Sequence, residues 1–199
     1  MGLMGLNHMN DDATQAARSG PSFGQLPLSE AMQANLQTLG YVAMTPIQAA
    51  SLPLALAGKD LIAQAKTGSG KTVAFGLPLL ARLNPRFFGV QALVLCPTRE
   101  LADQVPTEIR RLARAEDNIK VVTLCGGVPL RGQLATLEHG AHIVVGTPGR
   151  VMDHMRAVYL RVRRGCVRAR QLFYKRLNTR CIFFSTLSKS FNGKDILIA

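Results

Sequence analysis

The chain has 199 residues, 47% of them hydrophobic, and it carries a formal net charge of +12. This length and apolar content favour one folded domain with a sizeable core and exclude an intrinsically disordered chain. No apolar run approaches the roughly 20 residues needed to cross a bilayer, so the sequence predicts no membrane partner.

The positive charge is concentrated in the last part of the chain. Residues 1–155 hold 13 basic and 11 acidic side chains, whereas residues 156–199 hold 11 basic side chains and 1 acidic one. We therefore divide the chain into residues 1–21, 22–155 and 156–199. The first of these segments lacks a basic region followed by an apolar one, which excludes a signal peptide, and we predict that it is a flexible leader.

The first predicted element is a helix in the segment "LSEAMQANLQTLGY". Ser29 is placed to cap its start, apolar residues recur at helical spacing, and Gly40 is placed to end it. Four units then follow in chain order, each with a short apolar strand, a loop and a helix. The strands are expected at "DLIAQA", "QALVLC", "KVVTLC" and "AHIVVG", and the second helix should be kinked at Pro106.

Strands with little alternation, separated by helices, predict an α/β fold with a parallel sheet covered by helices on both faces. In such sheets ligands bind beyond the carboxyl ends of the strands. Four unusual segments follow the predicted strands at that edge. They are the glycine-rich loop after the first strand, "PTREL", a Gly126-Gly127 turn and "TPGR".

The glycine-rich loop has the spacing of a phosphate-binding P-loop, with alanine in place of the first glycine. Glycines let backbone amides approach a phosphate, and the helix that follows offers its own N-terminal amides. Lys71 would contact the β- and γ-phosphates, and Thr72 would offer a hydroxyl to Mg²⁺. The alternative is a glycine-rich turn that binds nothing. The candidate loop residues are Ala65, Lys66, Thr67, Gly68, Ser69, Gly70, Lys71 and Thr72.

Together with "TPIQ" at residues 45–48, these segments occur in one order that resembles the first RecA-like domain of DEAD-box RNA helicases. The residues of "PTRELADQ" and "LCGG" are most similar to those of the bacterial DbpA-type branch of that family. The resemblance covers about residues 22–155. It implies an incomplete P-loop RecA-like domain with ATP and Mg²⁺ as cofactors and single-stranded RNA as partner. Another P-loop ATPase or kinase is disfavoured by "PTRELADQ" and "TPGR".

The resemblance also implies roles for individual residues. Within a Q motif at residues 23–48, Phe23 would pack on the adenine face and Gln48 would hydrogen-bond the adenine edge. Taken alone, Phe23 could be a core aromatic and Gln48 a helix-surface amide. The remaining candidates would contact the RNA backbone, which carries no base information. They are Pro97, Thr98, Arg99, Gly126, Gly127, Thr147, Pro148, Gly149 and Arg150.

Residues 156–199 depart from the family pattern. The family carries the sequence Asp-Glu-Ala-Asp some two dozen residues after "TPGR", but the only acidic residue here after Asp153 is Asp195. The second RecA-like domain is also missing from this chain. We therefore predict a chain that binds nucleotide but cannot hydrolyse ATP or unwind RNA by itself. The missing strands should leave an open apolar edge beside the P-loop strand and a weakly stable fold.

Two explanations of the basic tail remain open. It could be an out-of-frame product of a frameshift near codon 156, which we favour because the composition changes so abruptly. It could instead be a native arm that makes the chain a non-enzymatic nucleic-acid-binding protein. No further strand–loop–helix unit is expected in it. The four cysteines form no CxxC pair, which is typical of reduced thiols and predicts a cytoplasmic location.

Overall fold

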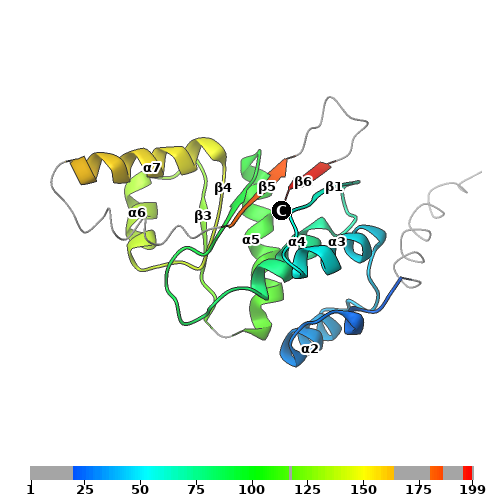
Figure 1. Cartoon of the computed structure of the whole chain (residues 1–199). Coiled ribbons are helices and arrows are strands. Elements are labelled where there is room, and N and C mark those ends of the chain that lie inside the picture. The colour runs from blue at the N-terminus through cyan, green and yellow to red at the C-terminus, as the bar shows by residue number, and fades with distance from the viewer. Residues whose placement is uncertain (1–19, 117, 164–179, 186–194, 199) are drawn as a thin grey trace, which may run out of the picture.

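The computed structural model describes residues 20–116, 118–163, 180–185 and 195–198, so most of the predicted leader and much of the basic tail lie outside the described residues. Its described strands form one sheet in the order β1-β6-β5-β2-β4-β3 (Figure 1). The strands are β1 (Ile62–Ala65), β2 (Ala92–Leu95), β3 (Val121–Leu124), β4 (Ile143–Gly146), β5 (Arg180–Ser185) and β6 (Asp195–Ile198).

The helices alternate with the first four strands, as the sequence predicted. A short 3-10 turn, η1 (Phe23–Gln25), precedes them, and a second one, η2 (Ala113–Ala115), follows α5. No helix of the described ranges is both long and apolar enough to cross a membrane. The α-helices are α2 (Glu30–Thr38), α3 (Pro46–Leu56), α4 (Lys71–Leu80), α5 (Arg99–Leu112), α6 (Leu130–Glu138) and α7 (Pro148–Arg163).

The central strands β2, β4 and β3 are parallel, with Val94 opposite Val145 and Leu124 opposite Gly146. Alternate side chains of a strand point to opposite faces of the sheet. Val94 and Val145 accordingly lie in one core cluster with residues of α4 and α5, while Val144 lies in a second cluster with Val151 of α7. The predicted α/β architecture with helices on both faces is thus confirmed.

The first helix, α2, has the predicted boundaries. The Ser29 hydroxyl accepts a hydrogen bond from the Met32 amide at 3.2 Å, and Gly40 beyond the other end has a φ of 81°. A left-handed φ of this kind suits glycine, which has no Cβ. The side chain of Asn35 also donates to the Leu112 carbonyl at 2.9 Å, which ties α2 to the end of α5.

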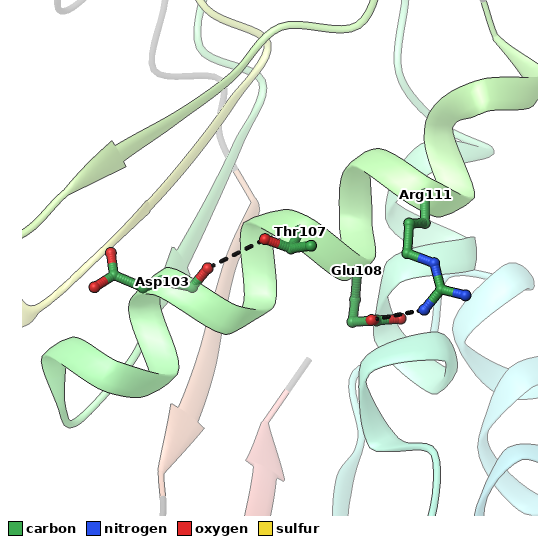
Figure 2. A network of polar contacts seen from close by, with 4 residues as sticks. All are labelled: Asp103, Thr107, Glu108 and Arg111. Atoms are coloured by element: carbon green, nitrogen blue, oxygen red, sulfur yellow. Dashed lines mark hydrogen bonds and ion pairs between the residues drawn. The ribbon is translucent and has the colours of Figure 1, made fainter.

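Helix α5 continues through Pro106, which lies inside it. Figure 2 shows its polar contacts nearby: the Thr107 hydroxyl donates to the Asp103 carbonyl at 3.4 Å, and Arg111 pairs with Glu108 at 2.9 Å. Both partners of the ion pair are partly exposed, so it contributes little to stability. The stability of α5 comes instead from its buried face, which packs on β3 and β4.

The structure corrects the prediction for the tail. Strands β5 and β6 lie between β1 and β2, so the open apolar edge expected beside the P-loop strand is wrong. Short apolar segments gain backbone hydrogen bonds by pairing with a strand. Without β5 and β6, the facing edges of β1 and β2 would both be unpaired, so both could accept such a segment. β5 runs parallel to β2, whereas β6 is antiparallel to both β5 and β1. Helix α7 also crosses the proposed boundary at residue 155.

Candidate nucleotide and RNA site

Four loops leave the carboxyl ends of β1, β2, β3 and β4 and carry the predicted site residues. The parallel register of β2, β4 and β3 brings the last three of these ends to one edge of the sheet. Each loop leads into a helix, namely α4, α5, α6 or α7. Backbone amides at four helix N-terminal regions therefore gather near this edge, which favours the binding of anions.

The glycine-rich loop connects β1 to α4 with two left-handed residues. Gly68 has a φ of 80°, and Gly70, which caps α4, has a φ of 84°. A Cβ at Gly68 would meet no atom within 4 Å, so the backbone there is open to a ligand. The hydroxyl of Ser69 is buried and has no hydrogen-bond partner among the described residues. The loop thus offers both an open approach and an unsatisfied polar group to a phosphate.

Lys71 lies under this loop. Its ammonium group donates to the Ala65 carbonyl at 2.9 Å and to the Lys66 carbonyl at 2.6 Å, and its side chain is only 6% exposed. These contacts cross-link the two ends of the loop. A phosphate bound in the loop would offer Lys71 a full negative charge in place of carbonyl dipoles.

Gln48 and Thr45 hold the loop from the side of α3. The Gln48 amide accepts from the Thr45 backbone N–H at 2.9 Å and donates to the Gly70 carbonyl at 3.1 Å. The Thr45 hydroxyl donates to the Ser69 carbonyl at 2.8 Å. We call these contacts the α3 clasp. Gln48 is 2% exposed, so it is not the helix-surface amide of the alternative interpretation.

Phe23 is 4% exposed and lies in the hydrophobic core. Its ring meets Tyr41 edge-on, with centroids 6.1 Å apart. Burial also raises the pKa of Tyr41, with a smaller contribution from the charge of Glu108, so the phenol stays neutral. The packing agrees with the core-aromatic interpretation, and a contact between Phe23 and adenine stays a prediction.

The residues of the loop fit the phosphates of ATP. Thr72 stands in the first turn of α4, directly after the loop, which is the position that a Mg²⁺ contact requires. No cluster of three acidic, histidine or cysteine side chains that could hold a metal occurs within the described ranges. Magnesium commonly binds through substrate phosphates and only one or two protein groups, so this does not conflict with the assignment.

The predicted RNA contacts surround the turn after β3. Thr98 caps α5 by accepting from the Leu101 amide at 3.3 Å, and the guanidinium of the next residue, Arg99, lies beside the Gly126-Gly127 turn. A Cβ on Gly126 would lie 3.0 Å from the Arg99 guanidinium, and one on Gly127 would lie 3.4 Å from it. Arginine and backbone thus approach closely at this turn, and the φ of 95° at Gly127 favours glycine there.

Arg150 reaches the same turn from α7. Its guanidinium donates to the Val128 carbonyl at 2.9 Å, and the Thr147 amide donates to the Leu124 carbonyl at 3.1 Å. Pro148 and Gly149 form the first turn of α7 directly after Thr147. Two guanidinium groups, exposed glycines and helix amides thus meet at one place, a set of donors suited to a phosphate backbone.

Two buried thiols lie behind this surface. Burial raises the pKa of Cys96 to about 12, with a further contribution from Cys125, and it also raises the pKa of Cys125. The charge of Asp103 raises the pKa of Cys125 further, whereas the hydrogen bond from the Thr147 amide lowers it. Both cysteines are free thiols. They fill space in the core and supply no nucleophile.

Sequence reasoning missed three side chains that hold the site. Thr45 lies in "TPIQ", but the motif predicted a role only for Gln48. The spacing of Thr45 and Gln48 is that of a helix capping pair, which could have identified it. Gln133 and His154 were not singled out at all. They form a hydrogen bond at 2.8 Å between α6 and α7, and Gln133 also donates to the Cys125 carbonyl at 3.0 Å.

Comparison with known proteins points to one family. The DEAD/DEAH box helicase family matches residues 45–175 of the chain. The ATP-dependent RNA helicase DbpA of Escherichia coli is 60% identical over 128 residues, which is 64% of this chain. The DEAD-box ATP-dependent RNA helicase CshA of Streptococcus pneumoniae is 48% identical over 131 residues, or 66% of this chain.

A solved structure gives the same result at the level of the fold. The DEAD box protein from the hyperthermophile Methanococcus jannaschii superposes with a TM-score of 0.64 and 41% sequence identity, covering 68% of this chain and 37% of that one. The present chain spans only 28% of the length of the Escherichia coli relative and 25% of the Streptococcus relative.

Proposed function

Because the chain belongs to the DEAD/DEAH box helicase family, we propose that it is the ATP-binding and RNA-binding part of an ATP-dependent RNA helicase. The observation that carries this proposal is the convergence of the P-loop, Thr98, the Gly126-Gly127 turn and Arg150 at the ends of β1 to β4. The names of the relatives support ATP as nucleotide and RNA as partner. A cytoplasmic location stays a prediction.

The site has two parts with different chemistry. The P-loop would bind the triphosphate through backbone amides and Lys71, with Thr72 contributing to a bound Mg²⁺. The α3 clasp would keep the loop beside α3 while the phosphates bind. The second part would bind single-stranded RNA through Arg99, Arg150 and the turn between them. Such contacts read the sugar–phosphate backbone and not the bases.

We further propose that this chain alone does not hydrolyse ATP. Hydrolysis needs one carboxylate to hold Mg²⁺ and another to orient the attacking water. Between Asp153 and the last residue the sequence holds one carboxylate, Asp195. Its backbone lies opposite Ala65 in the pairing of β6 with β1, which is a closer position to the P-loop than the sequence suggested. One carboxylate still cannot fill both roles.

The direct test measures nucleotide binding and turnover on the full chain. We expect Mg²⁺ and a fluorescent ATP analogue to bind the unmodified chain, and Lys71→Ala to weaken binding by at least about tenfold, as loss of a charged hydrogen bond implies. Lys59→Ala is the matched control, because Lys59 is an exposed lysine outside the loop. Turnover that requires both Lys71 and Asp195 would overturn the proposal of no hydrolysis.

A second function rests on the charge of the tail. Residues 156–199 hold 11 basic side chains and 1 acidic one, which could bind nucleic acid without any contribution from the loops. Binding through the tail should weaken steeply with salt and should not respond to ATP. Binding through the loops should weaken in Arg99→Gln. The control is Arg86→Gln, since Arg86 is exposed and precedes β2, away from the carboxyl edge.

A further inference from the structure

His154 is a buried histidine that the proposed function does not use. It lies on α7, is 1% exposed, and belongs to none of the motifs that the sequence singled out. Its Nε2 atom is 2.8 Å from the side-chain oxygen of Gln133 on α6. Its Nδ1 atom is buried and has no hydrogen-bond partner among the described residues. Burying a polar ring with one unpaired nitrogen costs free energy, and the hydrogen bond to Gln133 offsets that cost only in part.

The direction of each hydrogen bond in this network can be assigned. The Gln133 amide nitrogen donates to the Cys125 carbonyl at 3.0 Å, so its oxygen faces His154. An amide oxygen only accepts, so Nε2 of His154 carries the proton and donates. The chain of donors therefore runs from His154 on α7, through Gln133 on α6, to the carbonyl that precedes the Gly126-Gly127 turn.

A second contact from α7, made by an arginine, binds the carbonyl on the other side of the same turn. Arg150 donates to the Val128 carbonyl at 2.9 Å. Arg150 and His154 are four residues apart on α7, so they share one face of the helix. The two carbonyls that flank Gly126-Gly127 are thus both held from α7, one directly and one through Gln133.

We propose that His154 and Gln133 are positioning residues that fix the Gly126-Gly127 turn in the shape in which it meets RNA. The proposal rests on the proposed function for its RNA part. The turn itself has little to hold it: its glycines have no side chains, and Gly127 adopts a φ of 95°. Its conformation therefore depends on the groups that bind the carbonyls on either side. His154 acts on the turn only through Gln133.

The decisive experiment measures NMR order parameters of the backbone amides of residues 126–128 in the full chain, with no RNA present. We expect these order parameters to fall from about 0.85, typical of rigid backbone, to below about 0.6 in Gln133→Ala and in His154→Ala. His154→Gln should restore the rigid value, because its amide can donate as Nε2 does. His139→Ala is the matched control, since His139 is an exposed histidine at the end of α6.

Gln133→Glu separates the two links of the network. A glutamate can still accept from His154 but cannot donate to the Cys125 carbonyl. We expect low order parameters at the turn in this variant even though the His154 contact is kept. Because Gln133 is partly exposed, this variant and Gln133→Ala should fold even if His154→Ala does not. Unchanged order parameters at the turn in both Gln133 variants would overturn the proposal.

Affinity for a labelled single-stranded RNA oligonucleotide then tests the functional part. If the unmodified chain binds, we expect about fivefold weaker binding in Gln133→Ala and recovery from His154→Ala in His154→Gln. Equal affinities in all variants would overturn the role in RNA binding. If the unmodified chain binds no RNA, the proposed function fails, and the order-parameter experiment still decides whether these residues position the turn.

Discussion

His154 makes the stability of the chain depend on pH. Burial lowers its pKa below the ordinary value of 6.5, the charge of Arg150 lowers it further, and Asp153 opposes both. A group whose pKa is lower in the folded state is protonated more readily in the unfolded state as pH falls. The free energy of unfolding should therefore be highest above pH 6.5 and should decline as pH falls through the folded pKa.

Urea unfolding of the unmodified chain and of His154→Gln at several pH values checks this prediction. The variant cannot titrate at this position but can still donate to Gln133, so its stability should decline less on acidification. The difference between the two chains removes the contributions of the other histidines. Parallel pH profiles would show that His154 does not sense pH.

Cys96 should be chemically inert in the folded chain. Its pKa, raised from 9.0 to about 12, leaves about a thousandfold less thiolate than an exposed cysteine has at the same pH. We expect alkylation of its peptide, followed by mass spectrometry, to be very slow in native buffer and fast in urea. Fast labelling in native buffer would mean that the region around β2 opens readily.

At the scale of elements, the α3 clasp should make Gly70 far less replaceable than Gly68. Both have left-handed φ values, but a Cβ on Gly70 would collide with the Gln48 amide, whereas one on Gly68 meets nothing. Gly68→Ala should cost about 1 kcal/mol from backbone strain alone, and Gly70→Ala about 2–3 kcal/mol. The free energy of unfolding from urea titrations measures both.

The double variant Gln48→Ala with Gly70→Ala identifies the cause. Removing the Gln48 side chain should relieve the collision, so the two substitutions together should cost less than the sum of each alone. If the losses in the free energy of unfolding are additive, a collision with the Gln48 side chain is not the cause of the cost at Gly70. Equal costs for Gly68→Ala and Gly70→Ala would lead to the same conclusion.

The elements themselves were largely predictable from the sequence, because their signals are local. Ser29 and Gly40 mark the ends of α2, and the four short apolar strands lie where the sequence predicted them. The links between elements were not predictable. His154 and Gln133 are 21 positions apart, and nothing in their neighbourhoods indicates that α6 and α7 bring them together. Of the site, the motif residues could be named, but the groups that hold them could not.

At the scale of the whole molecule, the open edge expected beside β1 was predicted wrongly for a physical reason. Composition identified residues 156–199 as basic, and basic segments seldom form sheet interiors. The two short strands in it pair with β2 and β1 all the same. Whether the tail is native or out of frame stays a proposal, and translation of the encoding DNA in all three frames tests it. A frame that continues into Asp-Glu-Ala-Asp would support the frameshift.

Strand β1 depends on the tail for its place in the sheet. Among the described strands it pairs with β6 alone, with Ile62 opposite Ile198 and Ala65 opposite Asp195. Deleting residues 164–199 should therefore leave the strand that carries the P-loop without backbone partners. We expect a loss of several kcal/mol in the free energy of unfolding and weaker ATP binding, although no residue of the loop is changed.

This dependence decides how RNA binding by the tail should be tested. A deletion would disturb β1 and the tail charge together, so lost RNA binding would not identify the cause. Replacing Arg161, Arg163, Arg164 and Arg168 by glutamine removes charge without removing β5 or β6. If the loops bind RNA, this variant should keep the effect of ATP on RNA affinity and lose only part of the salt dependence. Complete loss of RNA binding, with ATP binding intact, would instead assign RNA binding to the tail.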